Sequence, residues 1–145
     1  MNVPSHPAGE KQSLKGLRLR KHADYQIAYS RAHKRQSASM SWFLAPSAES
    51  GAGARVGLTV GKVIGKAHER NRIKRRMREA LRRHIDLLPS GADIILHPRR
   101  LVLTLEFTKL EAEVVRILTQ AGKEAGRASR ASEDQPHAPG PGPIR

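Results

Sequence analysis

The chain has 145 residues and carries 27 Lys and Arg against 13 Asp and Glu, which gives a net charge of +14. A surplus of cations this large indicates a polyanionic partner such as a nucleic acid. The chain has no cysteine, which excludes disulfides and thiolate metal sites, and no apolar run approaches the ~20 residues of a membrane-spanning helix. The first residues lack the apolar core of a secretory signal, so we expect a cytoplasmic protein with no membrane partner.

The composition predicts one folded domain, over residues 14–124, between two tails. Residues 1–13 combine two prolines and a glycine with mostly polar side chains, and residues 125–145 are rich in Pro, Gly and Ser. Neither tail can bury enough apolar surface to offset the entropy that is lost on ordering. We therefore predict that both tails are disordered.

The first half of the domain indicates one helix and two strands. Residues 22–31 fit a short helix with Tyr25 and Tyr29 on one face. Apolar and polar side chains alternate over residues 37–45 and again over residues 55–62, as in half-buried strands. The connection between the two strands is rich in Ser, Ala and Gly, so we predict a hairpin in which they are antiparallel.

The second half begins with a basic helix that starts near residue 67 and ends at Leu88, before Pro89. About a third of its circumference is an apolar stripe that must pack on the rest of the domain. The stripe consists of Ile73, Met77, Ala80, Leu81, His84 and Leu88. A solvated helix face usually mixes charges of both signs, whereas here only Glu79 can pair with arginines at helical spacing, so we favour a surface that binds a polyanion.

Two further elements follow the basic helix. The apolar run over residues 93–97 indicates a central strand that is covered on both faces. Apolar side chains then recur at helical spacing over residues 106–123, where Thr108 and Glu111 have the spacing of a capping box. The order of the elements predicts one small sheet with helices packed on it, an α+β fold or α/β sandwich.

Histidines and carboxylates form no catalytic or metal-binding motif. His68 and Glu69 begin like the HExxH zinc motif, but Arg72 stands where the second His is needed. A nuclease that acts alone would need two or three convergent carboxylates for its metal ions. The candidates, one for each predicted element, are Asp24, Asp86, Asp93 and Glu106. The sequence therefore identifies no catalytic residue and no metal ligand.

Several stretches together carry a family resemblance. RNRIKRRMREALR, preceded by VGLTVGKVIGKAHE, is the most specific block, with RLRKHADYQIAY before it and DIILHPR after it. In motif, order and spacing the chain resembles the protein subunit of bacterial ribonuclease P over residues 14–124. The resemblance implies a small mixed sheet with three helices, in which the long basic helix lies in a left-handed βαβ crossover, although about 98% of such crossovers are right-handed.

The resemblance also implies partners and chemistry. Members of this family bind a catalytic RNA, and that RNA carries out the Mg²⁺-dependent hydrolysis that removes the 5′ leader of precursor tRNA. The Mg²⁺ is expected to be bound mainly by the RNA and the substrate, and no protein partner is required. The chain would then be the non-catalytic subunit of an endoribonuclease, which explains why it lacks a carboxylate cluster.

The family's RNR motif and the basic positions around it are expected to contact the catalytic RNA. They fall on Lys62, Lys66, Arg70, Asn71, Arg72, Lys74, Arg75 and Arg78. Where the family often has SKK, this chain has Gly61, Lys62 and Val63. A phosphate contact made by the second cation is therefore either lost or supplied by Lys66.

The resemblance further implies a cleft for the single-stranded leader, lined by Tyr25, Tyr29 and Phe43. Stacking suits this task because every base has a π face, so aromatic side chains can hold leaders of varied sequence. The alternative is that Tyr25 or Phe43 is simply part of the core, because the chain has few aromatic residues with which to build one.

Two other functions compete with this interpretation. A ribosome- or DNA-associated basic protein could use the same helix as a groove binder, but it would have no use for aromatic side chains that face a single strand. An autonomous nuclease would cleave RNA in Mg²⁺ with no RNA subunit added. Reconstitution with a catalytic RNA distinguishes all three.

Overall fold

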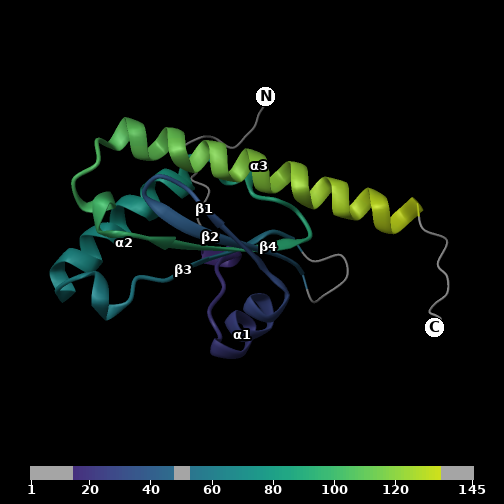
Figure 1. Ribbon diagram of the computed structural model, residues 1–145, viewed down its shortest axis with the longest axis horizontal. Coiled ribbons are helices and arrows are strands. Elements are labelled where there is room, and N and C mark those ends of the chain that lie inside the picture. The colour runs from purple at the N-terminus through teal and green to yellow at the C-terminus, as the bar shows by residue number, and fades with distance from the viewer. Residues whose placement is uncertain (1–14, 48–52, 135–145) are drawn as a thin grey trace, which may run out of the picture.

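Helices lie on both faces of a four-stranded sheet (Figure 1) in a computed structural model that describes residues 15–47 and 53–134. The helices are α1 (His22–Arg31), α2 (Ala67–Arg82) and α3 (Phe107–Asp134), the strands are β1 (His33–Gln36), β2 (Met40–Pro46), β3 (Arg55–Leu58) and β4 (Ala92–Pro98), and the 3₁₀ turns are η2 (Lys15–Leu17), η3 (Lys62–Ile64), η4 (Ile85–Leu87) and η5 (Arg100–Leu103). The predicted α+β class, with three helices on a mixed sheet, is confirmed for this described part of the chain.

The sheet has the strand order β1-β2-β4-β3. Strand β2 pairs antiparallel with both β1 and β4, and β3 pairs parallel with β4. Our prediction that the strands now seen as β2 and β3 form an antiparallel hairpin is therefore wrong, because β4 lies between them. The hairpin partner of β2 is β1, whose four residues are all exposed and polar, so that no apolar alternation marked it as a strand.

Strand β4 holds the central position that its apolar run predicted. Ile94, Ile95 and Leu96 are completely buried, with alternate side chains on opposite faces of the sheet. Because β3 and β4 are parallel neighbours, the chain between them is a crossover that contains α2. The crossover itself is confirmed, and its left-handed sense stays a prediction.

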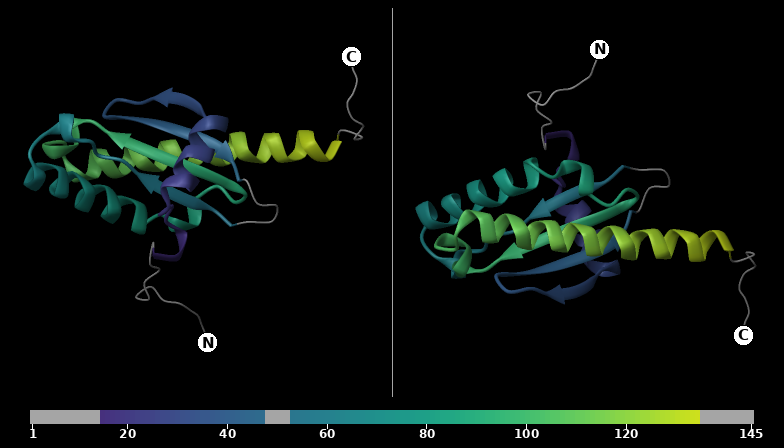
Figure 2. Two further views of the ribbon diagram at one scale, coloured as in Figure 1. Left: turned by 90° about the horizontal axis from the view of Figure 1, so that it is seen from below. Right: turned by 90° about the horizontal axis from the view of Figure 1, so that it is seen from above.

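The two faces of the sheet carry different cores. On one face, α2 and α3 pack on the side chains of Met40, Trp42, Ile94 and Leu96. On the other face, α1 packs on a smaller group around Ala45 and Ile95. Figure 2 shows this arrangement from both sides: α1 crosses the sheet in the left view, and α3 crosses it in the right view.

Helix α3 is longer than predicted and begins differently. It continues to Asp134, beyond residue 123 and into the stretch that we predicted to be a disordered tail. Its later turns are rich in Ala, Lys, Glu and Arg, which favour helix, and Pro136 is the first proline after it. The helix starts at Phe107, so Thr108 lies inside its first turn and the predicted capping box is wrong. The predicted tails 1–13 and 135–145 lie outside the described residues.

No helix in the described part of the chain has the combination of length and apolarity that a bilayer span requires. This holds for α3 as well, although it has 28 residues.

Candidate nucleic-acid interface

An apolar stripe determines which side of α2 faces outward. Ile73, Met77 and Ala80 are completely buried, and Leu81 is 1% exposed. These side chains pack into the core that α2 shares with the sheet and α3. Burial of a large apolar side chain contributes about 1.5–3 kcal/mol, so rotation of the helix about its axis would be costly. The stripe predicted from the sequence is confirmed at these four positions. The predicted end of the helix at Leu88 is wrong, because α2 ends at Arg82 and His84 and Leu88 lie beyond it.

The opposite side of α2 and the turn before it form a cationic surface. The predicted RNA-contacting residues that are exposed are Lys62, Lys66, Asn71, Arg72, Arg75 and Arg78. Lys74 is half buried. Within the described ranges no carboxylate forms an ion pair with a Lys or Arg of this set. The surface therefore keeps its positive charge available for a polyanion.

Two arginines of α2 bind the protein's own backbone. Arg70, the first residue of the RNR motif, donates from Nε to the carbonyl oxygen of Gly65 at 3.1 Å. Arg76 donates to the carbonyl oxygen of Leu105, and burial, together with the charge of Arg72, lowers the pKa of Arg76 below its ordinary value. Arg76 thus connects α2 to the segment before α3. Arg70 connects α2 to Gly65, in the turn before the helix.

The N-terminus of α2 is fixed by Glu69. Its Oε1 atom accepts a hydrogen bond from the backbone N–H of Lys66 at 2.9 Å, and its Oε2 atom lies 2.6 Å from Nη2 of Arg100. Hydrogen bonds from Arg100 and then from the Lys66 amide hold the pKa of Glu69 at about 2. Arg100 also donates to the carbonyl oxygen of Ile64 at 3.0 Å. This cluster fixes the turn η3, and with it Lys62, against the start of α2.

The arginines at the C-terminal end of α2 have acidic partners, Glu79 and Glu111. Arg82 and Arg83 both pair with Glu79, at 2.7 and 2.9 Å, and their hydrogen bonds lower the pKa of that carboxyl group. Arg83 also lies over the ring of Phe107, with 4.9 Å between its Cζ and the ring centroid. The uncompensated charge is therefore concentrated between residues 62 and 78.

The three predicted leader-binding aromatics lie together on the α1 side of the sheet. The ring centroids of Tyr25 and Tyr29 are 6.3 Å apart, and those of Tyr29 and Phe43 are 5.2 Å apart in an edge-on arrangement. All three side chains are half buried. Tyr25 also accepts a hydrogen bond from the backbone N–H of Leu58, at 3.3 Å from its hydroxyl oxygen. Helix α1 and strand β2 thus place these three rings together as one aromatic surface.

A fourth ring, that of His97, belongs to this surface and was not predicted. Its centroid lies 4.8 Å from that of Phe43, and its Nε2 atom lies 2.6 Å from the Tyr29 hydroxyl oxygen. The same hydroxyl lies 3.4 Å from Oγ1 of Thr59. Burial, and then the charge of Lys34, lower the pKa of His97, which favours the neutral ring. The two-residue period of β4 could have placed His97 on the same face as Ile95.

Half burial leaves both interpretations of the aromatic residues standing. Tyr25, Tyr29 and Phe43 pack against the small core around Ala28 and Ile95, as core residues would. Each nevertheless keeps part of its ring accessible, as a stacking surface requires. Their assignment to a leader stays a prediction.

Metal-binding side chains do not gather in the described part of the chain. No three His, Asp or Glu residues lie close enough there to hold a metal ion together. The four carboxylates considered from the sequence include Asp93 and Asp24, and both of these lie against the guanidinium group of Arg55, at 3.0 and 3.5 Å. These residues do not fit a resident Mg²⁺ ion, and we assign none to them.

Comparison with known protein families matches most of the described part of the chain. The model of the family described as Ribonuclease P matches residues 14–122, a segment that contains α1, the sheet, α2 and most of α3. The chain belongs to the ribonuclease P protein family. Membership in the ribonuclease P protein family implies a role in tRNA processing and partnership with ribonuclease P RNA.

Individual members of the ribonuclease P protein family are similar over most of their length. The ribonuclease P protein component of Finegoldia magna is 30% identical over 110 residues, which cover 76% of this chain and 95% of the relative. That of Desulfovibrio desulfuricans is 31% identical and covers 74% of this chain and 84% of the relative. Among solved structures, the RNase P protein of Thermotoga maritima has a TM-score of 0.62 at 25% identity, over 71% of this chain and 96% of that one. The protein from Staphylococcus aureus has a TM-score of 0.61 at 27% identity, over 72% and 94%.

Proposed function

We propose that this chain binds a catalytic RNA through α2 and holds the single-stranded 5′ leader of precursor tRNA on the α1 side of the sheet. The catalytic RNA would perform the hydrolysis that releases the leader. The Mg²⁺ ions that this reaction uses would be bound mainly by the RNA and the substrate. The chain would contribute affinity and orientation and no catalytic side chain.

The observation that carries the proposal is the pairing of two unlike surfaces on one small domain. The cations between residues 62 and 78 have no acidic partners in the described chain, which suits the phosphates of a folded RNA. The half-buried rings of Tyr25, Tyr29 and Phe43 suit unpaired bases, because base stacking on an aromatic side chain requires no particular sequence. A protein that bound only duplex nucleic acid would need the first surface and not the second.

Reconstitution tests this proposal. The purified chain should leave precursor tRNA intact, whereas the chain added to a bacterial ribonuclease P RNA at low Mg²⁺ should restore removal of the 5′ leader. The product should have the mature 5′ end. Cleavage by the chain without RNA, lost on substitution of a carboxylate, would instead identify an autonomous nuclease.

A second arm of the same experiment tests the assigned surface. The double substitution Arg72→Ala and Arg75→Ala should reduce stimulation of the RNA at low Mg²⁺, because two phosphate contacts are lost. The double substitution Lys109→Ala and Lys123→Ala is the matched control, since it also removes two charges and both side chains are exposed on α3, outside residues 62–78. Equal losses in both variants would mean that only the total charge of the chain matters.

A further inference from the structure

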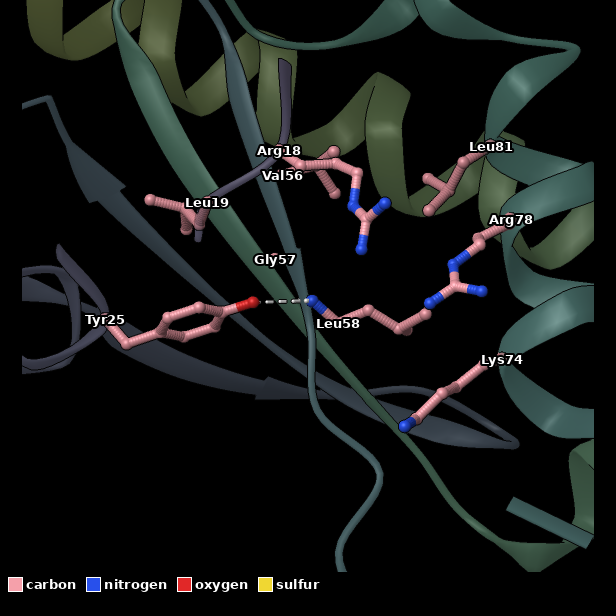
Figure 3. A pocket seen from close by; sticks show the side chains of 9 residues that line it. All are labelled: Arg18, Leu19, Tyr25, Val56, Gly57, Leu58, Lys74, Arg78 and Leu81. Atoms are coloured by element: carbon pink, nitrogen blue, oxygen red, sulfur yellow. Dashed lines mark hydrogen bonds between the residues drawn. The ribbon is translucent and has the colours of Figure 1, made fainter. Parts of the chain in front are cut away.

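A small cavity lies between α2 and the outer edge of β3, and three cationic side chains from the described segments line it. Arg18 comes from the segment before α1, and Lys74 and Arg78 come from α2. Figure 3 shows Lys74 and Arg78 reaching from the helix toward the edge of β3, with Arg18 entering beside Val56. Two segments that are far apart in the sequence thus direct positive charge into one space.

Among the residues that the structure describes, no Asp or Glu lines this cavity. Within the described ranges, Arg18, Lys74 and Arg78 also form no ion pair elsewhere. Three cations that share a cavity repel one another unless an anion lies between them. The arrangement therefore favours a negatively charged ligand.

The position of Arg18 is built into the fold. Its backbone forms a parallel bridge with Val56, and the next residue, Leu19, donates from its N–H to the carbonyl oxygen of Val56 at 2.9 Å. Leu19 is itself 4% exposed. The segment before α1 is therefore held along the edge of β3, and Arg18 is presented at a defined place beside α2.

Tyr25 forms the wall that the cavity shares with the aromatic surface. Its hydroxyl is hydrogen bonded to the N–H of Leu58 at 3.3 Å, as the dashed line in Figure 3 shows. Gly57 allows the ring to approach the strand this closely, because a Cβ atom at that position would lie 2.7 Å from Cε1 of Tyr25. On its other side Tyr25 neighbours Tyr29. An anion in the cavity would thus lie next to the place where the proposed leader stacks.

We propose that this cavity binds one backbone phosphate of the single strand whose bases stack on Tyr25, Tyr29 and Phe43. The cavity has a volume of about 170 Å³, several times the ~30 Å³ that a water molecule takes in the liquid, so a phosphate group fits. Arginine forks match the geometry of phosphate oxygens, and Lys74 adds a point charge. This inference rests on the proposed function, adds Arg18 to the residues that bind the leader, and assigns Lys74 and Arg78 to the leader in place of the catalytic RNA.

The test measures binding of a short single-stranded leader oligonucleotide to the full chain by fluorescence anisotropy. In a series of oligonucleotides, one phosphate at a time is replaced by an uncharged methylphosphonate. One replacement should weaken binding to the wild-type chain far more than the others, by roughly tenfold, as expected when one charge-assisted hydrogen bond is lost. Arg18→Gln should also weaken binding of the unmodified oligonucleotide, and that one replacement should then have a smaller effect than it has in the wild type, because Lys74 and Arg78 remain.

Lys109→Ala is the control and should keep the wild-type profile. Arg78→Gln provides a second variant, because its side chain is exposed and the substitution leaves the apolar stripe of α2 intact. It should reduce the same position dependence as Arg18→Gln does. If the losses from Arg18→Gln and from the methylphosphonate simply add, the cavity does not hold that phosphate and the inference is overturned.

Two further arms separate the possible outcomes. Phe43→Ala reports on stacking outside the cavity: if it weakens the oligonucleotide while the methylphosphonate profile of the wild type is flat, the cavity inference fails and the leader surface stands. Inorganic phosphate, added at constant ionic strength, should not displace the oligonucleotide at micromolar concentration. Displacement at that concentration would assign the cavity to the free anion and overturn the inference.

Discussion

The two faces of the sheet carry different types of side chain. The face toward α2 and α3 is covered by a continuous, largely aliphatic core in which Ile73, Met77 and Leu118 are completely buried. The face toward α1 has a small buried group, and around it lie half-buried rings that carry hydrogen-bonding groups. An aliphatic core gains most of its free energy from complete burial. The α1 face leaves much of that gain unused, which is expected of a surface that completes its contacts with a ligand.

This difference separates stability from binding in space. Substitutions on the α2 and α3 face should unfold the chain before they change its binding. Substitutions on the α1 face should change binding in a chain that stays folded. The following predictions test that separation, from the largest expected effect to the smallest.

Leu118→Ala should destabilise the chain most. Leu118 is completely buried in the core between α3 and the sheet, and truncation of such a residue costs about 2–5 kcal/mol through lost transfer free energy and the cavity left behind. Denaturant unfolding of both proteins measures the difference. Thr119→Ala, at an exposed position of the same helix, should stay within about 0.5 kcal/mol of the wild type. Similar losses for both substitutions would mean that α3 is not packed as described.

Gly57→Ala should displace the ring of Tyr25 on the α1 face of the sheet. The new Cβ atom would lie 2.7 Å from Cε1 of Tyr25, so the ring must move, at a cost of about 1–3 kcal/mol. Leader binding should fall as well, because Tyr25 leaves its place.

Two controls sharpen this prediction. Gly61→Ala should have little effect, because within the described ranges no atom beyond the adjacent residues lies within 4 Å of a Cβ atom at that position. Adding Tyr25→Ala to Gly57→Ala should return part of the lost stability by removing the clash. If the double variant is less stable than either single variant, the close approach of Tyr25 is not the cause.

Arg72→Ala should act on RNA binding alone. Arg72 is exposed, so its removal should leave stability near that of the wild type. The slope of log K against log salt for the catalytic RNA should flatten by roughly 0.7–0.9, the value for one phosphate contact. The preference for precursor over mature tRNA should not change. A fall in affinity with an unchanged slope would make Arg72 structural.

His97 should make the stability of the α1 face depend on pH. Because burial lowers its pKa in the folded chain, the unfolded chain takes up a proton first as the pH falls below about 6.5. Stability from the neutral ring is therefore present above that pH and is lost as the pH falls toward the folded pKa. Melting curves from about pH 8 to about pH 5 should show a smaller decrease for His97→Gln than for the wild type. An identical decrease would show that His97 is not the group that titrates.

The amino-acid pattern predicts elements with strong periodicity and misses those without it. The stripe of α2 and the central place of β4 follow from their apolar spacing, and the expected RNA-contacting positions other than Arg70 and Lys74 are exposed, as a contact surface requires. Arg70 shows a limit of such prediction. Its guanidinium group donates a hydrogen bond to the Gly65 carbonyl oxygen, and the spacing of residues in the sequence does not predict this contact. Strand β1 was missed because an exposed edge strand needs no apolar face.

Contacts between distant segments were the other source of error. The position of β4 between β2 and β3 depends on the whole fold. Strands that are consecutive in a sequence usually lie side by side, and our prediction that β2 pairs with β3 followed that rule. The cavity lined by Arg18 and Arg78 joins residues from two such segments. In the same way, His97 of β4 reaches the aromatic surface because β4 pairs with β2, the strand that carries Phe43. Local sequence patterns contain little information about such contacts between distant residues.

The central claim is that the α1 face holds a single-stranded leader, and Tyr25→Ala tests it most directly. Two titrations on this variant, with precursor tRNA and with leaderless mature tRNA, should be made on a holoenzyme whose protein has been checked for thermal stability. Binding of precursor tRNA should weaken by about 1–3 kcal/mol, the cost of losing one stacked base, while binding of mature tRNA stays unchanged. Tyr25→Phe should cost little, since the ring remains. An equal loss for both substrates, with a lower melting temperature, would place Tyr25 in the core and contradict the account.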